Sequence, residues 1–149
     1  MNEQDSTKIH DIVKESINTI SYIEKYSEKI IQITDHIVNS ISTGKKIIIF
    51  GNGGSAADSQ HIAAELIGKY ALERKSYPAI ALTTDTSALT AIANDYDYNQ
   101  VFSRQCQGLV NDGDTVIGIS TSGNSENVKL GLEVSNEKGA FTIGLLGNN

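Results

Sequence analysis

Four side chains that could carry chemistry recur at helical spacing near the middle of the chain: Asp58, His61, Glu65 and Lys69. Spacings of three and four residues place them along one face of a helix. An imidazole and a carboxylate one turn apart can ligate zinc, and a carboxylate beside a sugar carbon can act as a general base. The alternative is a solvated stripe in which Glu65 and Lys69 form an ordinary ion pair. Two ligands make only part of a zinc site, so the pattern indicates at most half of one.

Two loops rich in glycine, serine, threonine and asparagine form a second candidate. The first reads Gly51-Asn52-Gly53-Gly54-Ser55, and the second reads Ser120-Thr121-Ser122-Gly123-Asn124-Ser125. Each loop follows an apolar run and opens a helix, where glycine lets the backbone approach a ligand and successive N–H groups attract an anion. The pattern predicts a phosphate site. For either loop alone, the alternative is a plain turn with good capping residues.

A dinucleotide site is a competing interpretation, because Gly51, Gly53 and Ala56 fit the pattern G-x-G-x-x-G/A. That pattern needs an acidic residue about 20 positions further on, at the end of the second strand. The nearest candidate, Asp85, lies too far along the chain. The hydroxyl-rich second loop also suits one phosphate and sugar hydroxyls better than a pyrophosphate, so a sugar phosphate is favoured.

Alternating strands and helices must position these residues. Short apolar runs typical of buried parallel strands predict strands at 46–50, 79–82, 115–119 and 141–146. Helices are expected at about 55–69, 87–93 and 101–109, and from the second loop to Gly139, with Ser55 as the cap of the first. In a flavodoxin-like strand order, the first and third strands are neighbours at the topological switch point, so both loops would face one crevice. We therefore predict an α/β fold with a parallel sheet flanked by helices.

Isoleucines dominate the residues before the first strand. Together with Val13 and Val38, they recur at helical spacings of three and four from Ile9 to Ile23 and from Ile30 to Ile41, which predicts two amphipathic helices, the second closed by Gly44. We assign residues 1–44 to helices for packing or oligomerisation and residues 45–149 to a sugar-phosphate-binding domain. The chain ends at Asn148-Asn149, just after the fourth predicted strand. We therefore expect a longer protein, with a final strand and helix missing here.

Composition narrows the classes of function. The chain has 149 residues, a net charge of −6 and a single cysteine, Cys106. This charge argues against nucleic-acid binding, which usually needs a basic face, but not against an anionic substrate, because backbone N–H groups carry no formal charge. No apolar run approaches the roughly 20 residues of a membrane-spanning helix, and the polar N-terminus does not match a signal peptide. One cysteine cannot form an intrachain disulfide, so we expect a cytoplasmic protein with no nucleic-acid or membrane partner.

Five motifs stand in order along nearly the whole chain: Gly51-Asn52-Gly53-Gly54-Ser55, His61-x-x-x-Glu65, Asn94-Asp95, Phe102-Ser103-Arg104, and Ser120-Thr121-Ser122-Gly123-Asn124-Ser125. Together they resemble the phosphoheptose isomerases (sedoheptulose-7-phosphate isomerases) of the sugar-isomerase (SIS) domain family. The resemblance implies an SIS-type sheet and a homotetramer with sites at subunit interfaces. It also implies an isomerase that converts sedoheptulose 7-phosphate to D-glycero-D-manno-heptose 7-phosphate through an enediol, for lipopolysaccharide or capsule biosynthesis.

The resemblance also implies roles for individual residues. Ser120, Thr121, Ser122 and Ser125 would hold the phosphate; Asn52, Gly53, Gly54 and Ser55 would contact the substrate; Asn94 and Asp95 would lie nearby. His61 and Glu65 would ligate one zinc ion per site, and Glu65 would also transfer the proton. Family members complete the metal site with a glutamine and a histidine on a C-terminal helix, which this chain does not reach.

Two other functions remain open at this stage. A non-catalytic SIS protein binds the bacterial replication initiator as an adaptor, and the segment Ala91-Ile92-Ala93-Asn94-Asp95 resembles that branch. A sugar-phosphate-sensing module would keep the second loop but would need no proton-transfer residue. The presence of both His61 and Glu65 favours the enzyme.

Overall fold

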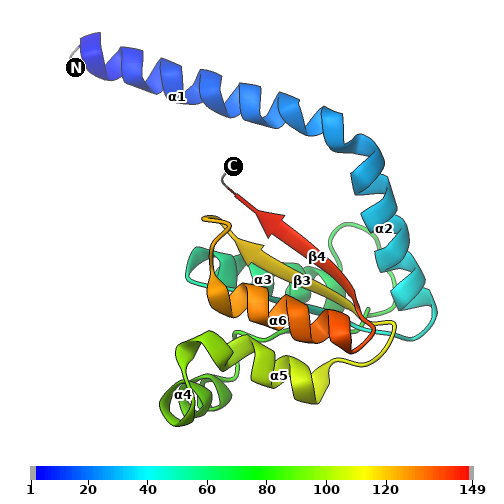
Figure 1. The fold of residues 1–149 in the computed structure, drawn as a ribbon. Helices are drawn as coiled ribbons and strands as arrows, with labels where there is room; N and C mark the ends of the chain where they lie inside the picture. The colour runs from blue at the N-terminus through cyan, green and yellow to red at the C-terminus, as the bar shows by residue number, and fades with distance from the viewer. Residues whose placement is uncertain (1–2, 148–149) are drawn as a thin grey trace. The chain divides into compact units, whose positions relative to one another are not determined.

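The computed structural model describes residues 3–147. Asn148 and Asn149, after which we expect a further strand and helix, lie outside the described residues. The chain divides into two compact units between Asp35 and His36. The first unit is helical and contains α1 (Glu3–Tyr22), the 3-10 turn η1 (Ile23–Tyr26) and the first part of α2 (Ser27–Ser42) (Figure 1). The two predicted N-terminal helices are confirmed.

The isoleucine stripe of α1, formed by Ile9, Ile12, Ile17 and Ile20, is exposed to solvent in the single chain. Ile9, Ile12 and Ile20 are exposed by 63%, 62% and 67% of their surface. An apolar stripe of this kind usually packs on another element or on a partner. Within residues 3–147, no helix is both long enough and apolar enough to cross a membrane.

The second unit is built on four parallel strands: β1 (Ile47–Gly51), β2 (Ala79–Ala81), β3 (Thr115–Ser120) and β4 (Phe141–Leu146). Their order in the sheet is β2-β1-β3-β4, and every neighbouring pair is parallel. The predicted parallel sheet and flavodoxin-like strand order are confirmed. In this order β1 pairs with β3, and the last residue of β1, Gly51, lies opposite Ile119. The loops after these two strands therefore start side by side.

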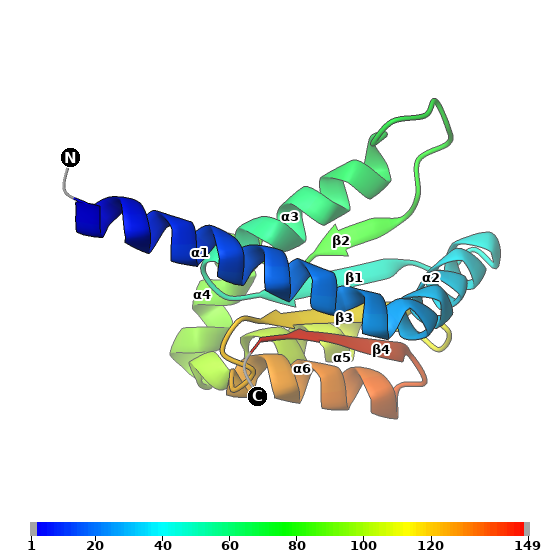
Figure 2. The same cartoon turned by 90° about the horizontal axis from the view of Figure 1, so that it is seen from above.

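Helices cover both faces of the sheet: α3 (Gly54–Ile67), α4 (Thr86–Asp95), α5 (Val101–Leu109) and α6 (Glu126–Glu137), with a 3-10 turn η2 (Tyr98–Gln100) between α4 and α5. A Cβ at Gly51 would lie 2.7 Å from Ser55 Cβ of α3, whereas a Cβ at Gly118 would lie 2.9 Å from Val128 Cγ1 of α6. Gly51 is paired with Ile119, so Gly51 and Gly118 face opposite sides of the pleated sheet. Figure 2 shows α3 beside β2 and β1, and α6 beside β4 and β3.

A buried apolar cluster lies between the sheet and helices α4, α5 and α6. Phe50 of β1 stacks on Phe102 of α5, with ring centroids 4.9 Å apart. The buried residues of the cluster are Ile48, Phe50, Leu82, Val101, Phe102, Cys106, Val110, Val116, Val128 and Ala140. This cluster fixes α5 and α6 against β1 and β3, the strands that carry the two loops. Burial raises the pKa of the Cys106 thiol to about 11.

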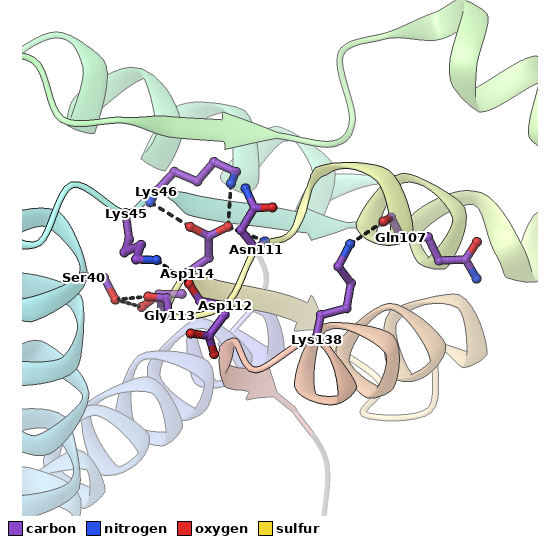
Figure 3. A network of polar contacts seen from close by, with 10 residues as sticks. Ser40, Lys45, Lys46, Gln107, Asn111, Asp112, Gly113, Asp114 and Lys138 are labelled. Atoms are coloured by element: carbon purple, nitrogen blue, oxygen red, sulfur yellow. Dashed lines mark hydrogen bonds and ion pairs between the residues drawn. The ribbon is translucent and has the colours of Figure 1, made fainter.

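A polar network holds the amino ends of β1 and β3 (Figure 3). Asp114, which is 1% exposed, accepts from the Lys46 ammonium at 2.5 Å and from the backbone N–H of Lys46 and Asn111 at 3.1 and 2.8 Å. Burial alone would raise the pKa of Asp114, but these hydrogen bonds and the Lys46 charge outweigh it and lower the pKa below its usual value. Ser40 adds a hydrogen bond to Thr115 Oγ1 at 2.8 Å and so joins the end of α2 to β3.

Candidate functional site

The two loops converge at the carboxyl ends of β1 and β3. Asn52, directly after β1, and Asn127, in the first turn of α6, form a reciprocal amide pair. Asn52 Nδ2 donates to Asn127 Oδ1 at 2.8 Å, and Asn127 Nδ2 donates to Asn52 Oδ1 at 2.9 Å. The side chains therefore bridge two segments that the strand order already places side by side. This edge of a parallel sheet is where ligands of such folds bind.

The first loop begins α3 earlier than the sequence pattern predicts. The cap is Gly53, with a φ of 55°, because its carbonyl accepts from the N–H groups of Ala56 and Ala57 at 3.1 and 3.3 Å. The prediction that Ser55 caps the helix is wrong: Ser55 lies inside the first turn and is 5% exposed. The positive φ at Gly53 is one that other residues adopt rarely. This turn leaves the N–H groups of Gly53 and Gly54 ahead of the helical hydrogen-bond ladder.

The second loop gathers serine hydroxyls at the start of α6. Ser120, 4% exposed, donates to Ser125 Oγ at 2.9 Å and lies 3.4 Å from Ser122 Oγ. Thr121 and Ser122 are exposed. The first N–H groups of a helix have no partner within the helix, so the amino end of α6 adds donors and a partial positive charge to this cluster of hydroxyls. Such a combination suits a phosphate.

Two cavities among the described residues lie away from these loops. One of about 380 Å³ is lined by Val38, Ile41, Ser42 and residues 75–78, and another of about 540 Å³ by residues 43–46, Pro78, Asn111 and Asp114. Both contain residues from the amino ends of the strands, whereas ligands of open parallel sheets bind at the carboxyl ends. A smaller cavity of about 230 Å³ includes Ser120, Gly123 and Ser125 of the second loop. We therefore place the candidate site at the loops.

On α3, His61 and Glu65 lie one turn apart with His61 Nε2 3.6 Å from Glu65 Oε1. Their side chains are 76% and 37% exposed, so both are accessible. The alternative ion pair between Glu65 and Lys69 does not form. α3 ends at Ile67, and Lys69 beyond it pairs with Glu73 instead. The acid–imidazole pair is thus free of a competing cation on its own helix.

The donor types of His61 and Glu65 suit zinc, because neutral imidazole nitrogen and carboxylate oxygen are both common zinc ligands. They supply two donors of the four that a tetrahedral site requires. Among residues 3–147, no group of three or more histidine, cysteine, aspartate or glutamate side chains is placed to hold a metal ion. The described residues therefore fit half of a zinc site.

Asn94 and Asp95 form the end of α4. Both are exposed, and Asn94 Nδ2 donates to Asp95 Oδ1 at 2.8 Å. The link from this segment to the first loop is Tyr98 of η2, whose hydroxyl donates to Asn52 Oδ1 at 3.2 Å. Sequence reasoning missed both Tyr98 and Asn127. Neither carries a local signal for this role, because their contacts join residues 46 and 75 positions apart.

The motif Phe102-Ser103-Arg104 lies in the first part of α5, next to the segment that carries Tyr98. Phe102 belongs to the apolar cluster, and Ser103 Oγ donates to the carbonyl of Gln100 at 3.2 Å. The Arg104 guanidinium lies 4.4 Å from the centre of the Tyr96 ring and donates to its hydroxyl at 3.1 Å. The motif therefore fixes the segment that joins α4 to α5, which carries Tyr98.

Comparisons with known proteins agree on one family. The family model described as SIS domain matches residues 12–147. The chain is 49% identical over 143 residues to the phosphoheptose isomerase of Aquifex aeolicus, an alignment that covers 95% of this chain and 75% of that protein. It is 51% identical over 140 residues to that of Geotalea daltonii, which covers 94% and 70%.

Solved structures give the same result. The phosphoheptose isomerase of Neisseria gonorrhoeae superposes with a TM-score of 0.88 at 41% identity, and the match covers 97% of this chain and 76% of that one. The enzyme of Francisella tularensis superposes with a TM-score of 0.91 at 32% identity, covering 100% and 78%.

Proposed function

Because this chain belongs to the phosphoheptose isomerases of the SIS-domain family, we propose that it interconverts sedoheptulose 7-phosphate and D-glycero-D-manno-heptose 7-phosphate. The observation that carries the proposal is the convergence of a glycine-rich loop and a serine-rich loop at the carboxyl ends of β1 and β3, next to a helix that bears His61 and Glu65. The reaction moves one proton between C1 and C2 of the sugar through an enediol. We place it in the supply of activated heptose for a surface polysaccharide.

The phosphate binds the second loop in this proposal. Thr121, Ser122 and Ser125 offer hydroxyl donors to the phosphate, Ser120 lies beneath them, and the amino end of α6 adds backbone N–H groups. The buried Ser120 orients the hydroxyls of Ser122 and Ser125 rather than opening to solvent itself.

The first loop and the end of α4 bind the sugar. The first loop, which directly follows β1, contributes Asn52, Gly53, Gly54 and Ser55. The N–H groups of Gly53 and Gly54 precede the first hydrogen bonds of α3. Asn94 and Asp95 supply an amide and a carboxylate that can bond to sugar hydroxyls. These groups orient the chain of hydroxyls so that C1 and C2 face α3.

Glu65 is the proton-transfer residue of this proposal. It is half-buried on α3, and its Oε1 lies 3.6 Å from His61 Nε2. A carboxylate that takes a proton from one carbon and returns it to the next needs only a small movement of its own. Proton transfer by a positioned side chain contributes about 10²- to 10⁴-fold to a rate.

His61 and Glu65 would hold one zinc ion, with its remaining ligands outside the described residues. When bound, zinc acts as a Lewis acid that stabilises negative charge on the oxygens of the substrate. The two functions of Glu65 compete, since a carboxylate on a cation is a weaker base. The carboxylate has two oxygens, and Oε1 is the one that faces His61.

We also propose that the active enzyme is a cytoplasmic homotetramer with sites at subunit interfaces. Two features support this. The isoleucine stripe of α1 is exposed in the single chain, with Ile9 and Ile20 at 63% and 67%. Cys106, the only cysteine, is buried as a free thiol. Light scattering coupled to gel filtration tests the assembly, and a monomer would contradict it.

The decisive experiment is an assay of the full-length protein with sedoheptulose 7-phosphate and added zinc, beside a Glu65→Gln variant. We expect turnover in the parent and a loss of at least about 10²-fold in the variant. Glu73→Gln is the matched control, because Glu73 is an exposed carboxylate that pairs with Lys69 outside the site. No turnover from folded, zinc-loaded parent protein would refute the enzyme and leave an adaptor or a sugar-phosphate sensor.

A further inference from the structure

Asn127 is a buried amide whose side chain pairs with that of Asn52. The residue is 3% exposed, and both polar atoms of its side chain bond to Asn52. A buried amide is costly unless its hydrogen bonds are made, so its placement requires Asn52 in one position. Sequence reasoning gives Asn127 no role, and it lies two residues beyond the serine-rich loop.

Asn52 is the connecting residue of the network. It follows β1 and precedes Gly53, the cap of α3. Its Oδ1 accepts twice, from Asn127 Nδ2 at 2.9 Å and from the Tyr98 hydroxyl at 3.2 Å, while its Nδ2 donates once, at 2.8 Å. Within residues 3–147, one N–H of the Asn52 amide is therefore left for a ligand. The network joins three segments: the first loop, the turn after α4 and the start of α6.

We propose that Asn127, assisted by Tyr98, is a positioning residue that fixes Asn52 and the backbone N–H groups of Gly53 and Gly54 toward the sugar phosphate. The inference rests on the proposed function and adds a residue to it. Asn127 acts through Asn52 and touches no substrate. Gly53 and Gly54 have no side chains that could hold the first loop in place. Without the amide pair of Asn52 and Asn127, the loop therefore loses the side-chain contact that sets its orientation.

A double-mutant cycle in the full-length protein tests the inference. Asn127→Ala is expected to lower kcat/KM for sedoheptulose 7-phosphate by about 10- to 100-fold, the effect of a lost pair of buried hydrogen bonds. In an Asn52→Ala background, Asn127→Ala is expected to lower kcat/KM by less than about twofold, because Asn127 has already lost its hydrogen-bond partner. Tyr98→Phe removes one donor to Asn52 from an exposed side chain, so it should fold and lower kcat/KM by about two- to fivefold.

The matched control is Ser135→Ala. Ser135 is another fully buried polar residue of α6, and its Oγ donates to the carbonyl of Gly131 at 2.6 Å, far along the helix from the loops. This variant is expected to be less stable and to keep its kcat/KM. If Ser135→Ala and Asn127→Ala lower kcat/KM equally, the effect is one of general stability and the inference fails.

Amide hydrogen exchange separates this inference from the proposed function. Residues 51–57 should exchange faster in Asn127→Ala than in the parent and in Ser135→Ala. If the parent has turnover but Asn127→Ala changes neither kcat/KM nor this exchange, the inference is wrong and the isomerase stands. If the parent has no turnover, the isomerase is wrong, and the exchange alone decides whether Asn127 positions the loop.

Discussion

His61 and Glu65 face each other across one turn of α3, with Nε2 and Oε1 3.6 Å apart, while Lys69 turns to Glu73. α3 ends at Ile67, so Lys69 no longer lies one helical turn from Glu65. An imidazole and a carboxylate that share an exposed helix face without a competing ammonium group are suited to a divalent cation.

The first prediction concerns zinc. His61→Ala in the full-length protein is expected to lower the affinity for zinc by more than about 100-fold, since even an outer-shell change costs 10- to 100-fold. Titration against a competing chelator measures the affinity. His10→Ala is the matched control, because His10 is an exposed histidine on α1 and is expected to leave zinc binding unchanged. Equal affinity in parent and His61→Ala would remove His61 from the metal site.

The second prediction concerns the phosphate. Ser122→Ala removes an exposed hydroxyl from the second loop and should raise KM for the sugar phosphate by about 5- to 30-fold, with a smaller change in kcat. Inorganic phosphate should weaken as a competitive inhibitor by the same factor, because the lost contact is to the phosphate. Ser16→Ala removes an exposed hydroxyl that bonds to the Ile12 carbonyl of its own helix and should change neither constant. If the inhibition constant of phosphate stays the same while KM rises, Ser122 contacts the sugar instead.

The sequence pattern predicts the fold well because each signal is local. The strand 141–146 and the helix 101–109 match β4 and α5 at both ends, since a run of apolar residues and a helical period end where turn residues begin. The alternation of strands and helices predicts a parallel sheet, whereas the strand order β2-β1-β3-β4 needed the further assumption of a flavodoxin-like fold. The start of α3 is missed by one residue, because glycine at 53 can adopt a positive φ and begin the helix without a side-chain cap.

In the candidate site, too, the features with a local sequence signal are the ones that could be predicted. The two loops and the pair on α3 are each visible within a few residues of sequence. The amide pair of Asn52 and Asn127 is not visible, because a buried asparagine in a first helical turn looks like any polar residue near a cap until the fold places its partner. Lys69 shows the opposite error: the spacing of four suggests a pair with Glu65, and only the end of the helix excludes it.

The third prediction concerns the close approach of β1, β3 and α3. A Cβ at Gly51 would lie 2.7 Å from Ser55 Cβ and 2.8 Å from the carbonyl oxygen of Ile119. Gly51→Ala should therefore push α3 from the sheet, lower the free energy of unfolding by about 1–3 kcal/mol and reduce activity through the displaced loop. Urea denaturation measures the first effect, and the isomerase assay measures the second.

Gly108→Ala is the matched control for that change. Gly108 lies on α5, and a Cβ there meets nothing within 4 Å. This variant should raise the free energy of unfolding by about 0.5–1 kcal/mol, because alanine favours the helix. If Gly51→Ala is as stable as the parent, the packing of α3 against the strands tolerates more than the structure indicates.

The fourth prediction concerns Asp114 and the pH dependence of stability. The pKa of this buried carboxyl is lowered in the folded protein, mainly because hydrogen bonds from Lys46 and from the Asn111 N–H outweigh the opposing effect of burial. A carboxyl with a lowered folded pKa stabilises the protein fully above its unfolded pKa of about 3.9, and the contribution is lost as the pH falls through the folded value. The free energy of unfolding should therefore fall below about pH 4.

Asp114→Asn should lower the free energy of unfolding at pH 7 by about 2–3 kcal/mol, because it removes the charge that Lys46 faces and leaves that ammonium without its partner. The variant should also lose less stability than the parent between about pH 4 and pH 2, since the group that titrates there is gone. Asp112→Asn changes an exposed carboxyl two residues away and should preserve the parent's pH profile. Urea denaturation across this range distinguishes the cases. Parallel profiles for parent and Asp114→Asn would mean that other carboxyls set the acid limit, and that the ion pair at the start of β1 and β3 adds little to the fold.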